Sequence, residues 1–504
     1  MPEHYRALIV ILLIAAFTFT YFKKNAVLIC NQQNFNTWRK YWFIFTLIAF
    51  LSNNFWVFML MGGLLMLKVV RNSNHVAIFF LLLFTVPPAG SEIPGFGLIN
   101  YFIELNHIRL LALTLLIPAY FIVRKQPYYI PFGKLLPDKI LILYLCLIAI
   151  LNLRDTSLTD TLRQSFYLGI DVFLPYVVIS RSVNTLQKFK EATFAFLMAV
   201  LILALIGAFE FTRHWLLYTS LTNALGIHWP LSNYLGRTDL LRALASTGQA
   251  IVLGYVIMVA IGFYLFLQNF MPRNIGNKLA ALALFAGAIA PLSRGPWIGV
   301  GILIVVFIAT GRNALRKMIL LLLISLIALP IVATLPGGNK IINLLPFIGE
   351  TEHENIDYRE KLIDNSMIVI KRNLMFGSVD YLKTPEMQAM KQGEGIIDIV
   401  NTYILVALES GLVGLCLFVG FFLVVLRGIH TGMKIETNRD SDYYLLGRVL
   451  LCSLVSILFT IATVSSITFI PIVYWSVGAL GIAYNQMMSI RKKPSVIYNN
   501  STPY

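Results

Sequence analysis

The sequence contains little charge and few cysteines. Only 13% of its 504 residues are Asp, Glu, Lys or Arg, whereas 58% are hydrophobic. A soluble domain carries about a quarter charged residues, so this composition excludes an ordinary soluble fold and predicts a protein that crosses a membrane many times. The few cysteines lie in or beside apolar stretches without paired spacing, which argues against a disulfide framework and against a cysteine metal site. They are Cys30, Cys146, Cys416 and Cys452.

Acidic residues are scarcer than basic ones. The 24 Asp and Glu residues against 40 Lys and Arg residues give a net charge of +16. In a soluble protein this excess would suggest a nucleic-acid partner. Here the basic residues form short clusters between apolar runs, which is the pattern of cytoplasmic loops in membrane proteins. We therefore expect no nucleic-acid partner.

Fifteen apolar runs approach the length of a membrane-spanning helix. The runs at 41–51 and 139–152 are short for a span, so we predict about 12 to 15 spans. The first run, 6–22, has no basic leader and no small-residue cleavage site, and we expect a retained helix rather than a signal peptide. The chain is therefore predicted to be an all-α, polytopic transmembrane helix bundle. The other runs lie near 54–70, 76–90, 107–123, 166–180, 190–211, 248–268, 277–292, 296–310, 318–335, 401–427, 446–466 and 469–488.

The basic clusters all fall on one side of these runs, which the positive-inside rule makes the cytoplasm. Two long loops then face away from the cytoplasm. Within the second, 351–372 has helical periodicity and is predicted to form an amphipathic helix along the outer membrane surface. The predicted divisions are N-terminal transmembrane helices (1–211), an outer loop (212–247), transmembrane helices with an SRG turn (248–335), a large outer loop (336–400), C-terminal transmembrane helices (401–488) and a cytoplasmic tail (489–504).

One outward-facing turn has the composition of an anion site. It reads Ser293-Arg294-Gly295-Pro296, where Gly295 allows close backbone approach to a ligand and Pro296 suits the first turn of the next helix. The guanidinium and the N–H groups of the helix N-terminus together favour an anion, and pyrophosphate is the natural occupant. A plain interfacial turn is the alternative. The other outward arginines, which could instead reach lipid phosphates, are Arg237, Arg242, Arg359 and Arg372.

Carboxylates and an amide surround the start of the run at 401–427. Glu394 and Asp398 precede it, while Asn401 and Glu409 lie within it. Asp398 is a candidate catalytic base or, alternatively, an N-cap that complements the helix dipole. Ionisable groups inside a span are costly and usually functional, so Glu409 has either a function or a hydrogen bond to a neighbouring helix.

The stretches LSRGPWIG (292–299) and VNTYILVALESGLVG (400–414), separated by the large outer loop, resemble the O-antigen ligase and O-antigen/exopolysaccharide polymerase superfamily of bacterial membrane proteins. The ligase motif is a histidine followed by Asn, Ser or Gln, nine residues, Gly, two residues and Gly. Asn401, Gly411 and Gly414 fit this spacing. The stretch 358–382 is similar to the loop before that motif, with an arginine and a Phe-Gly-x-Gly-like turn. The resemblance covers about 240–430.

One position departs from the motif. Val400 stands where the ligases have a histidine, which is thought to activate the acceptor hydroxyl. Valine cannot take a proton, so Asp398, or less readily Glu394, is the candidate replacement base, provided that it reaches the acceptor. The missing histidine favours a polymerase over a ligase.

The resemblance implies glycosyl transfer outside the cytoplasmic membrane, from an undecaprenyl-pyrophosphate-linked sugar chain to an acceptor hydroxyl. Arginines can stabilise the departing pyrophosphate, so neither a metal nor another cofactor is expected. The expected partners are the lipid-linked oligosaccharide, membrane lipid and other polysaccharide assembly proteins. The expected substrate-binding residues are Arg294, Ser293, Arg242, Arg237, Arg359 and Asn401, and Gly295, Gly411 and Gly414 are expected to have structural roles, the last two in close helix packing.

Three other functions remain open at this point. A ligase would use a different glycolipid or a protein as acceptor. A flippase for lipid-linked oligosaccharide would line a central cavity with charges from several spans, whereas intramembrane charge here is sparse (Glu210 and Glu409). A non-catalytic scaffold would tolerate Arg294→Ala. Aromatic residues of the first outer loop could stack on sugars or form an interfacial belt; they are Trp215, Trp229 and Tyr234.

Overall fold

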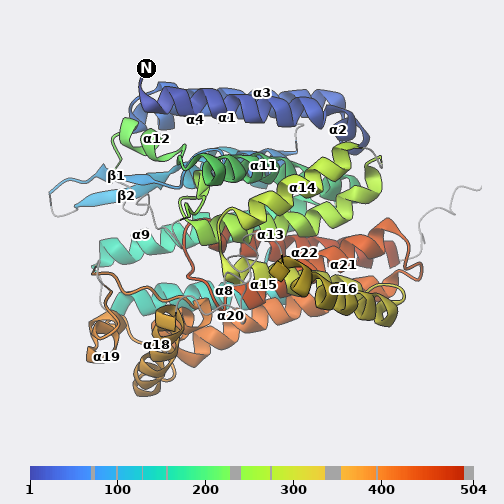
Figure 1. Cartoon of the computed structure of the whole chain (residues 1–504). Coiled ribbons are helices and arrows are strands. Elements are labelled where there is room, and N and C mark those ends of the chain that lie inside the picture. Colours follow the sequence, from blue (N-terminus) through green and yellow to red (C-terminus); the bar gives the residue numbers. More distant parts are fainter. Residues whose placement is uncertain are drawn as a thin grey trace, which may run out of the picture.

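The computed structural model describes residues 1–69, 74–97, 100–127, 129–154, 157–227, 240–272, 275–334, 353–392 and 395–492. Within these residues the chain is a stack of helices that run in nearly the same direction, with one two-stranded sheet (Figure 1). By length and composition, eight of the described helices could cross a membrane, and three shorter ones are also apolar. The predicted all-α polytopic bundle is confirmed.

Each apolar run of the sequence, apart from the second half of 76–90, falls on helical elements. In the N-terminal half, two of the long helices contain a π-helical turn, η1 and η3. The elements are α1 (Glu3–Tyr21), α2 (Lys23–Ile29), α3 (Gln32–Leu51), α4 (Phe55–Leu67), α5 (His75–Leu82), β1 (Gly90–Pro94), β2 (Tyr101–Asn106), α6 (His107–Leu111), η1 (Ala112–Leu116), α7 (Ile117–Arg124), α8 (Leu136–Leu151), η2 (Asn152–Arg154), α9 (Leu158–Leu168), η3 (Gly169–Phe173), α10 (Leu174–Ser182) and α11 (Leu186–Arg213).

The C-terminal half adds the remaining long helices and the short helices of the outer loops. Its elements are α12 (Thr219–Ala224), η5 (Ala245–Thr247), α13 (Ala250–Leu267), η6 (Gln268–Phe270), α14 (Ile275–Ile289), α15 (Arg294–Ala309), α16 (Ala314–Thr334), α18 (His353–Arg372), η7 (Tyr381–Lys383), α19 (Pro385–Gln388), α20 (Thr402–Ile435), α21 (Asp442–Thr460) and α22 (Ile470–Lys492).

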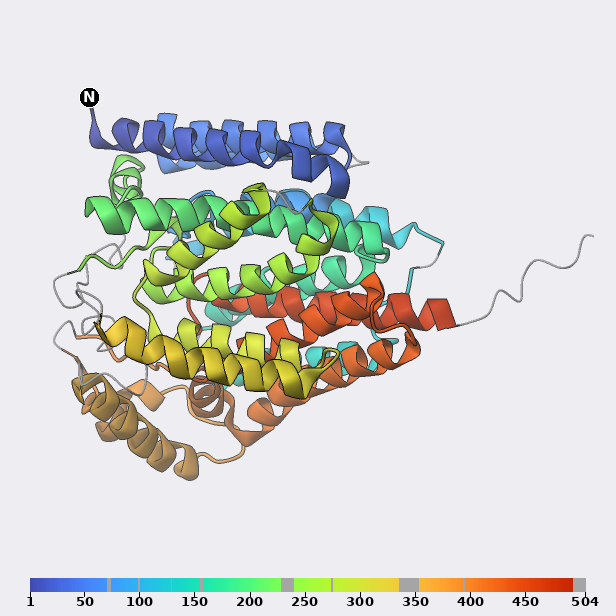
Figure 2. The same cartoon turned by 45° about the vertical axis from the view of Figure 1, so that its right-hand side comes forward.

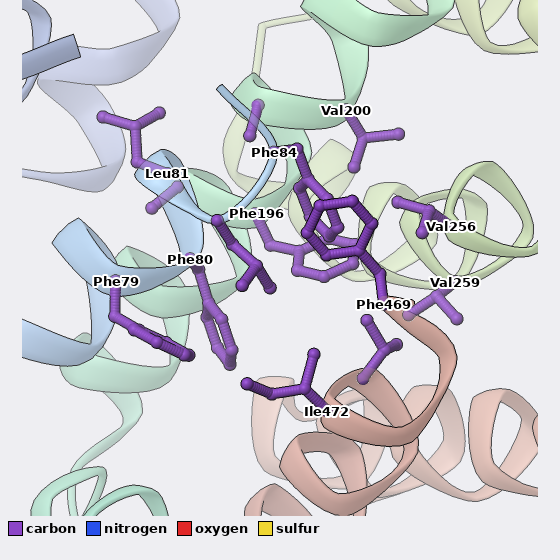
Figure 3. Packing of buried hydrophobic residues seen from close by; sticks show 14 of the residues in the cluster. Phe79, Phe80, Leu81, Phe84, Phe196, Val200, Val256, Val259, Phe469 and Ile472 are labelled. Atoms are coloured by element: carbon purple, nitrogen blue, oxygen red, sulfur yellow. The ribbon is translucent and has the colours of Figure 1, made fainter. Parts of the chain in front are cut away.

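The helix α11 lies at the centre because it is apolar on nearly all sides, as a buried helix must be. Phe196 of α11 meets the edge of Phe80 at 5.7 Å and of Phe84 at 5.4 Å between ring centroids. Phe84 in turn contacts Phe469, just before α22, at 5.0 Å. Figure 3 shows these rings with Val256 of α13 beside them. Edge-to-face packing of this kind adds to the dispersion that holds membrane helices together.

The run at 76–90 was expected to be one helix, and this expectation is wrong. The helix α5 ends at Leu82, and the chain continues into the antiparallel pair β1–β2, with Gly90 opposite Asn106. Pro87 and Pro88 explain the stop, because proline lacks the N–H that a helix needs. Arg163 of α9 fixes the hairpin by donating to the carbonyls of Tyr101 and Phe102.

The described parts of the two long loops lie at one end of the bundle. Figure 1 shows α12, α18 and α19 at the same end as the hairpin, with α2 at the opposite end, and the turned view in Figure 2 agrees for α12 and α18. One apolar side of α18 packs against protein, and the position of this helix along the membrane surface stays a prediction. Leu362 and Val369, each 1% exposed, contact α19 and the start of α20.

A buried ion pair joins α8 to α10 toward the other end of the molecule. Arg181 donates from Nη2 to Asp138 Oδ1 at 2.7 Å and Oδ2 at 2.6 Å. The Asp138 carboxylate also accepts hydrogen bonds from the hydroxyl of Tyr176 and the backbone N–H of Gly133. The two charged side chains are 1% and 0% exposed, so their charges are balanced by each other and by these donors rather than by water.

We predict that Arg181→Ala lowers the free energy of unfolding by about 3–5 kcal/mol, since it leaves a buried carboxylate without its counter-charge. The measurement is the thermal unfolding midpoint of the purified protein in detergent. The matched control is Arg312→Ala, whose ion pair with Asp440 is 73% and 71% exposed, and which should change the midpoint little. Equal shifts in the two variants would contradict the assignment.

Candidate functional site

The SRG turn joins α14 to α15 and is held by an arginine from the first outer loop. Arg242 donates from Nε to the carbonyl of Pro291 at 3.1 Å and from Nη2 to Ser293 Oγ at 3.0 Å. Ser293 is 3% exposed and stands at the N-cap position, and the half-buried Arg294 is the first residue of α15. The structure thus brings Arg242, Ser293 and Arg294 together at a helix N-terminus, where backbone N–H groups favour an anion.

A buried carboxylate fixes the loop that carries Arg242. Glu210, near the end of α11 and 0% exposed, accepts hydrogen bonds from the backbone N–H groups of Leu217, Leu244 and Ala245 at 2.8–3.0 Å. These donors come from both ends of the first outer loop. Sequence reasoning identified Glu210 only as an intramembrane charge, because two of its donors lie more than 30 positions away.

The segment 461–469, between α21 and α22, contacts both motif stretches. A Cβ on Gly295 would lie 2.9 Å from Thr463 Oγ1, so the absence of a side chain lets the SRG turn approach this segment. Thr402, at the start of α20, binds the same segment through two hydrogen bonds. Its backbone N–H donates to the carbonyl of Ile461 at 2.9 Å, and its hydroxyl donates to the carbonyl of Val464 at 3.0 Å. The two motif stretches therefore share one neighbourhood.

Asp398 lies exposed at the outer mouth of α20. Its Oδ1 accepts a hydrogen bond from Ser465 Oγ at 2.6 Å, and its backbone carbonyl accepts one from the Tyr358 hydroxyl at 2.9 Å. Burial raises the pKa of Tyr358, so this hydroxyl remains a donor at neutral pH. Asp398 is consequently oriented by α18 on one side and by the 461–469 segment on the other.

Asn401, and not Asp398, caps α20, so the N-cap interpretation of Asp398 is wrong. The Asn401 Oδ1 accepts from the backbone N–H groups of Tyr403 at 2.9 Å and Ile404 at 3.2 Å. This capping contact occupies the oxygen of the amide that was expected to orient substrate. Its Nδ2 group is the part that suits a substrate contact.

The helix α20 is interrupted at Gly411, whose φ of 66° and ψ of −166° are not helical. The chain following α18 inserts into this break. Leu412 donates from its backbone N–H to the carbonyl of Leu374 at 2.8 Å, and Ser378 donates to that of Leu408 at 2.8 Å. The Phe-Gly turn and the glycine motif noted in the sequence therefore meet through backbone hydrogen bonds.

Two glycines make this insertion possible. Gly377 and Gly411 both have φ of +66°, and a Cβ on either would collide with backbone atoms of the facing segment. Close helix packing was the expected role of Gly411, but the space it leaves is filled by the inserted chain. Gly414 does face a helix, since a Cβ there would lie 3.7 Å from Leu147 Cδ2 of α8.

Arg154 clamps the break from η2, and sequence reasoning missed it. It donates to the carbonyls of Gly377 at 3.0 Å and Glu409 at 3.3 Å. These acceptors are 223 and 255 positions away, and backbone acceptors leave no pattern of side-chain types that could have indicated them.

The remaining predicted residues fall into three groups. Arg359 is half-buried on α18, beside Tyr358. Arg372 forms an ion pair with Glu386 of α19 and holds the pKa of that carboxyl below its usual value. Trp215 donates a hydrogen bond from Nε1 to the carboxylate of Glu3 in α1 at 2.8 Å. Both therefore support the fold. Glu394, Arg237, Trp229 and Tyr234 lie outside the described residues.

Among the described residues, no three His, Cys, Asp or Glu side chains are grouped so that they could hold a metal ion. All four cysteines are free thiols.

We predict that Gly411→Ala lowers the free energy of unfolding by roughly 1–3 kcal/mol or more, because alanine disfavours this φ and its Cβ would displace the inserted chain. The matched control is Gly420→Ala in the same helix, where a Cβ meets nothing within 4 Å and alanine favours the helix. Thermal unfolding of both variants, followed by far-UV circular dichroism, checks the prediction. A Gly411→Ala variant as stable as Gly420→Ala would show that the break does not need glycine.

Comparison with known protein families gives a match to part of the chain. A family model described as O-Antigen ligase matches residues 279–419. The matched segment includes the SRG turn, α15, α18 and the first half of α20 with its break. The relation to the O-antigen ligase and polymerase superfamily predicted from the sequence is confirmed for this segment. No curated protein matches the chain.

Proposed function

We propose, from the O-antigen ligase domain at residues 279–419, that this multi-pass membrane protein is a glycosyltransferase that polymerises lipid-linked glycan. The donor would be an undecaprenyl-pyrophosphate-linked chain of O-antigen or exopolysaccharide repeat units. The reaction would take place at the outer face of the bacterial cytoplasmic membrane. The observation that carries the proposal is the convergence of Arg242 and Arg294 on the N-terminus of α15.

This convergence suits a departing pyrophosphate. Negative charge grows on the leaving group as the bond to the anomeric carbon breaks, so fixed positive groups there stabilise the transition state more than the ground state. Arg242 is held to the turn by two hydrogen bonds, and this preorganisation avoids reorientation during the reaction. Arg359 and Arg237 are proposed as further phosphate contacts. Because the arginines supply the positive charge, the proposed reaction needs no metal.

Asp398 is proposed as the general base, with Glu394 as the second candidate. It would take the proton from the acceptor hydroxyl while the acceptor oxygen bonds to the anomeric carbon of the donor sugar. The bond from that carbon to the pyrophosphate oxygen breaks, and its electron pair leaves with the pyrophosphate. Asp398 belongs to the same neighbourhood as the SRG turn, since Ser465 binds it and the nearby Thr463 borders Gly295. Asn401 would orient the substrate from the same helix mouth.

Ligation is the second candidate function, because the matching family is described as O-Antigen ligase. In that case the acceptor would be a different glycolipid or a protein. Val400 at the position of the motif's histidine favours polymerisation.

We predict that Arg294→Ala reduces glycosyl transfer by roughly 100-fold or more, the usual effect of removing a group that stabilises developing negative charge. The assay uses the full chain in lipid nanodiscs with native undecaprenyl-pyrophosphate oligosaccharide, and product length is read on a gel. The control is Arg312→Ala at the exposed pair with Asp440, which should leave the ladder unchanged. A full ladder from Arg294→Ala would refute the anion site. Transfer only after an acceptor glycolipid is added would identify a ligase.

We predict that Asp398→Asn lowers the turnover rate roughly 100-fold while the variant still binds undecaprenyl pyrophosphate, because general-base catalysis contributes about 10²–10⁴ in rate. Native mass spectrometry of the variant with undecaprenyl pyrophosphate supplies the binding control. An unchanged turnover rate would leave the glycosyltransferase assignment standing but would show that Asp398 is not the general base.

A further inference from the structure

Glu409 places a carboxylate inside a helix that is apolar enough to cross a membrane. Its neighbours Leu408 and Ser410 are buried, but Glu409 itself is exposed. The break at Gly411 follows two positions later, and Arg154 binds the Glu409 backbone carbonyl. A charged group at this depth is costly against lipid. Its side chain therefore requires either water or a polar ligand.

Tyrosines from three other elements surround this carboxylate. Tyr381 of η7 donates from its hydroxyl to Glu409 Oε1 at 3.4 Å. Tyr144 and Tyr474 lie on α8 and α22, the two helices that pack against α20 beside it. Tyr144 is half-buried, whereas Tyr381 is 8% and Tyr474 5% exposed. Glu409 therefore lies between α8, α20, α22 and the second outer loop.

This combination matches the chemistry of a sugar. A carboxyl group makes several hydrogen bonds at once, which suits neighbouring hydroxyl groups of a pyranose ring. Aromatic side chains with a few placed polar groups are the usual lining of a ligand site. A carboxylate repels the pyrophosphate of the donor, so the occupant is a neutral, hydroxyl-rich group rather than the lipid phosphate.

The position of Glu409 connects it to the proposed base. The Tyr474 hydroxyl lies 3.3 Å from Ser466 Oγ, and the preceding residue, Ser465, binds Asp398. The segment 461–469 thus connects the surroundings of Glu409 with Asp398, and a sugar held by Glu409 would lie beside this segment. The arginines that suit the donor pyrophosphate lie on the opposite side of the same segment, beyond Gly295 and Thr463.

We propose that Glu409, with Tyr144 and Tyr381, forms the subsite that binds the acceptor sugar and presents its hydroxyl to Asp398. This assignment rests on the proposed glycosyltransferase function and specifies its acceptor site. The fixed backbone at the helix break keeps the carboxylate in place, because Arg154 and the inserted chain hold the residues on both sides of it.

The test compares Glu409→Gln with wild type in the nanodisc assay, with the lipid-linked oligosaccharide varied as acceptor. Glutamine has the same size but no charge, and we expect the acceptor KM to rise about tenfold or more, the effect of losing a charge-assisted hydrogen bond. Undecaprenyl pyrophosphate binding, measured by native mass spectrometry, should stay within about twofold. The matched control is Glu92→Gln in β1, an exposed carboxylate at the same end of the molecule, which should leave both values unchanged.

A second measurement separates this proposal from the reaction itself. Saturation-transfer NMR with a panel of free hexoses tests sugar binding by wild type and Glu409→Gln without any turnover. Hexose signals that are lost in Glu409→Gln and kept in Glu92→Gln would support the subsite. If wild type gave such signals but elongated no glycan, the proposed function would fail and the subsite would stand. An unchanged acceptor KM together with unchanged hexose signals in Glu409→Gln would overturn the subsite.

Discussion

The outer site depends on the backbone hydrogen bonds made across the break in α20. A membrane helix satisfies its own N–H and C=O groups, and a break exposes some of them at a depth where water is scarce. Here the chain at 374–378 pairs with those groups. The same contact anchors the large outer loop and places Tyr381 beside Glu409. One irregularity of the backbone thereby joins the loop to the bundle and positions its polar side chains.

The charges around this site are separated by sign. Positive groups gather at the N-terminus of α15, whereas one carboxylate, Asp398, precedes α20 and another, Glu409, lies within it. The segment 461–469 stands between them and contacts both. Such an arrangement suits a reaction between an anionic leaving group and a neutral nucleophile. The positive groups attract the leaving group, whereas the carboxylates repel it and attract the hydroxyl of the nucleophile.

Features set by local pattern could be predicted from the sequence, and features set by distant backbone contacts could not. Apolar runs predicted the helices because burial follows hydrophobicity directly. The double proline at 87–88 was a local signal for the end of α5, but the run was treated as continuous. Glu210 and Arg154 bind backbone groups far along the chain, and no residue type at those distant positions indicates such a contact. Asp398 was considered as a cap and Asn401 was not, and only the geometry of the first turn identifies Asn401 as the cap.

The glycine motif illustrates the same limit. Its spacing was visible and its relation to a family could be stated, but spacing alone suggested helix packing. Gly377 and Gly411 both have a left-handed backbone, and each leaves room for the backbone of the segment that carries the other. Two motifs separated by more than 30 residues are in this sense one structural unit.

The buried pair of Asp138 and Arg181 has a consequence for biogenesis. Inserted alone, α8 would carry the charge of Asp138 unpaired in its first turn, and α10 would carry that of Arg181 unpaired in its last turn. Asp138 meets its partner only after the ribosome has added the 43 residues that separate them. The ion pair, and the neutralisation of both charges, therefore forms only after both helices have been synthesised.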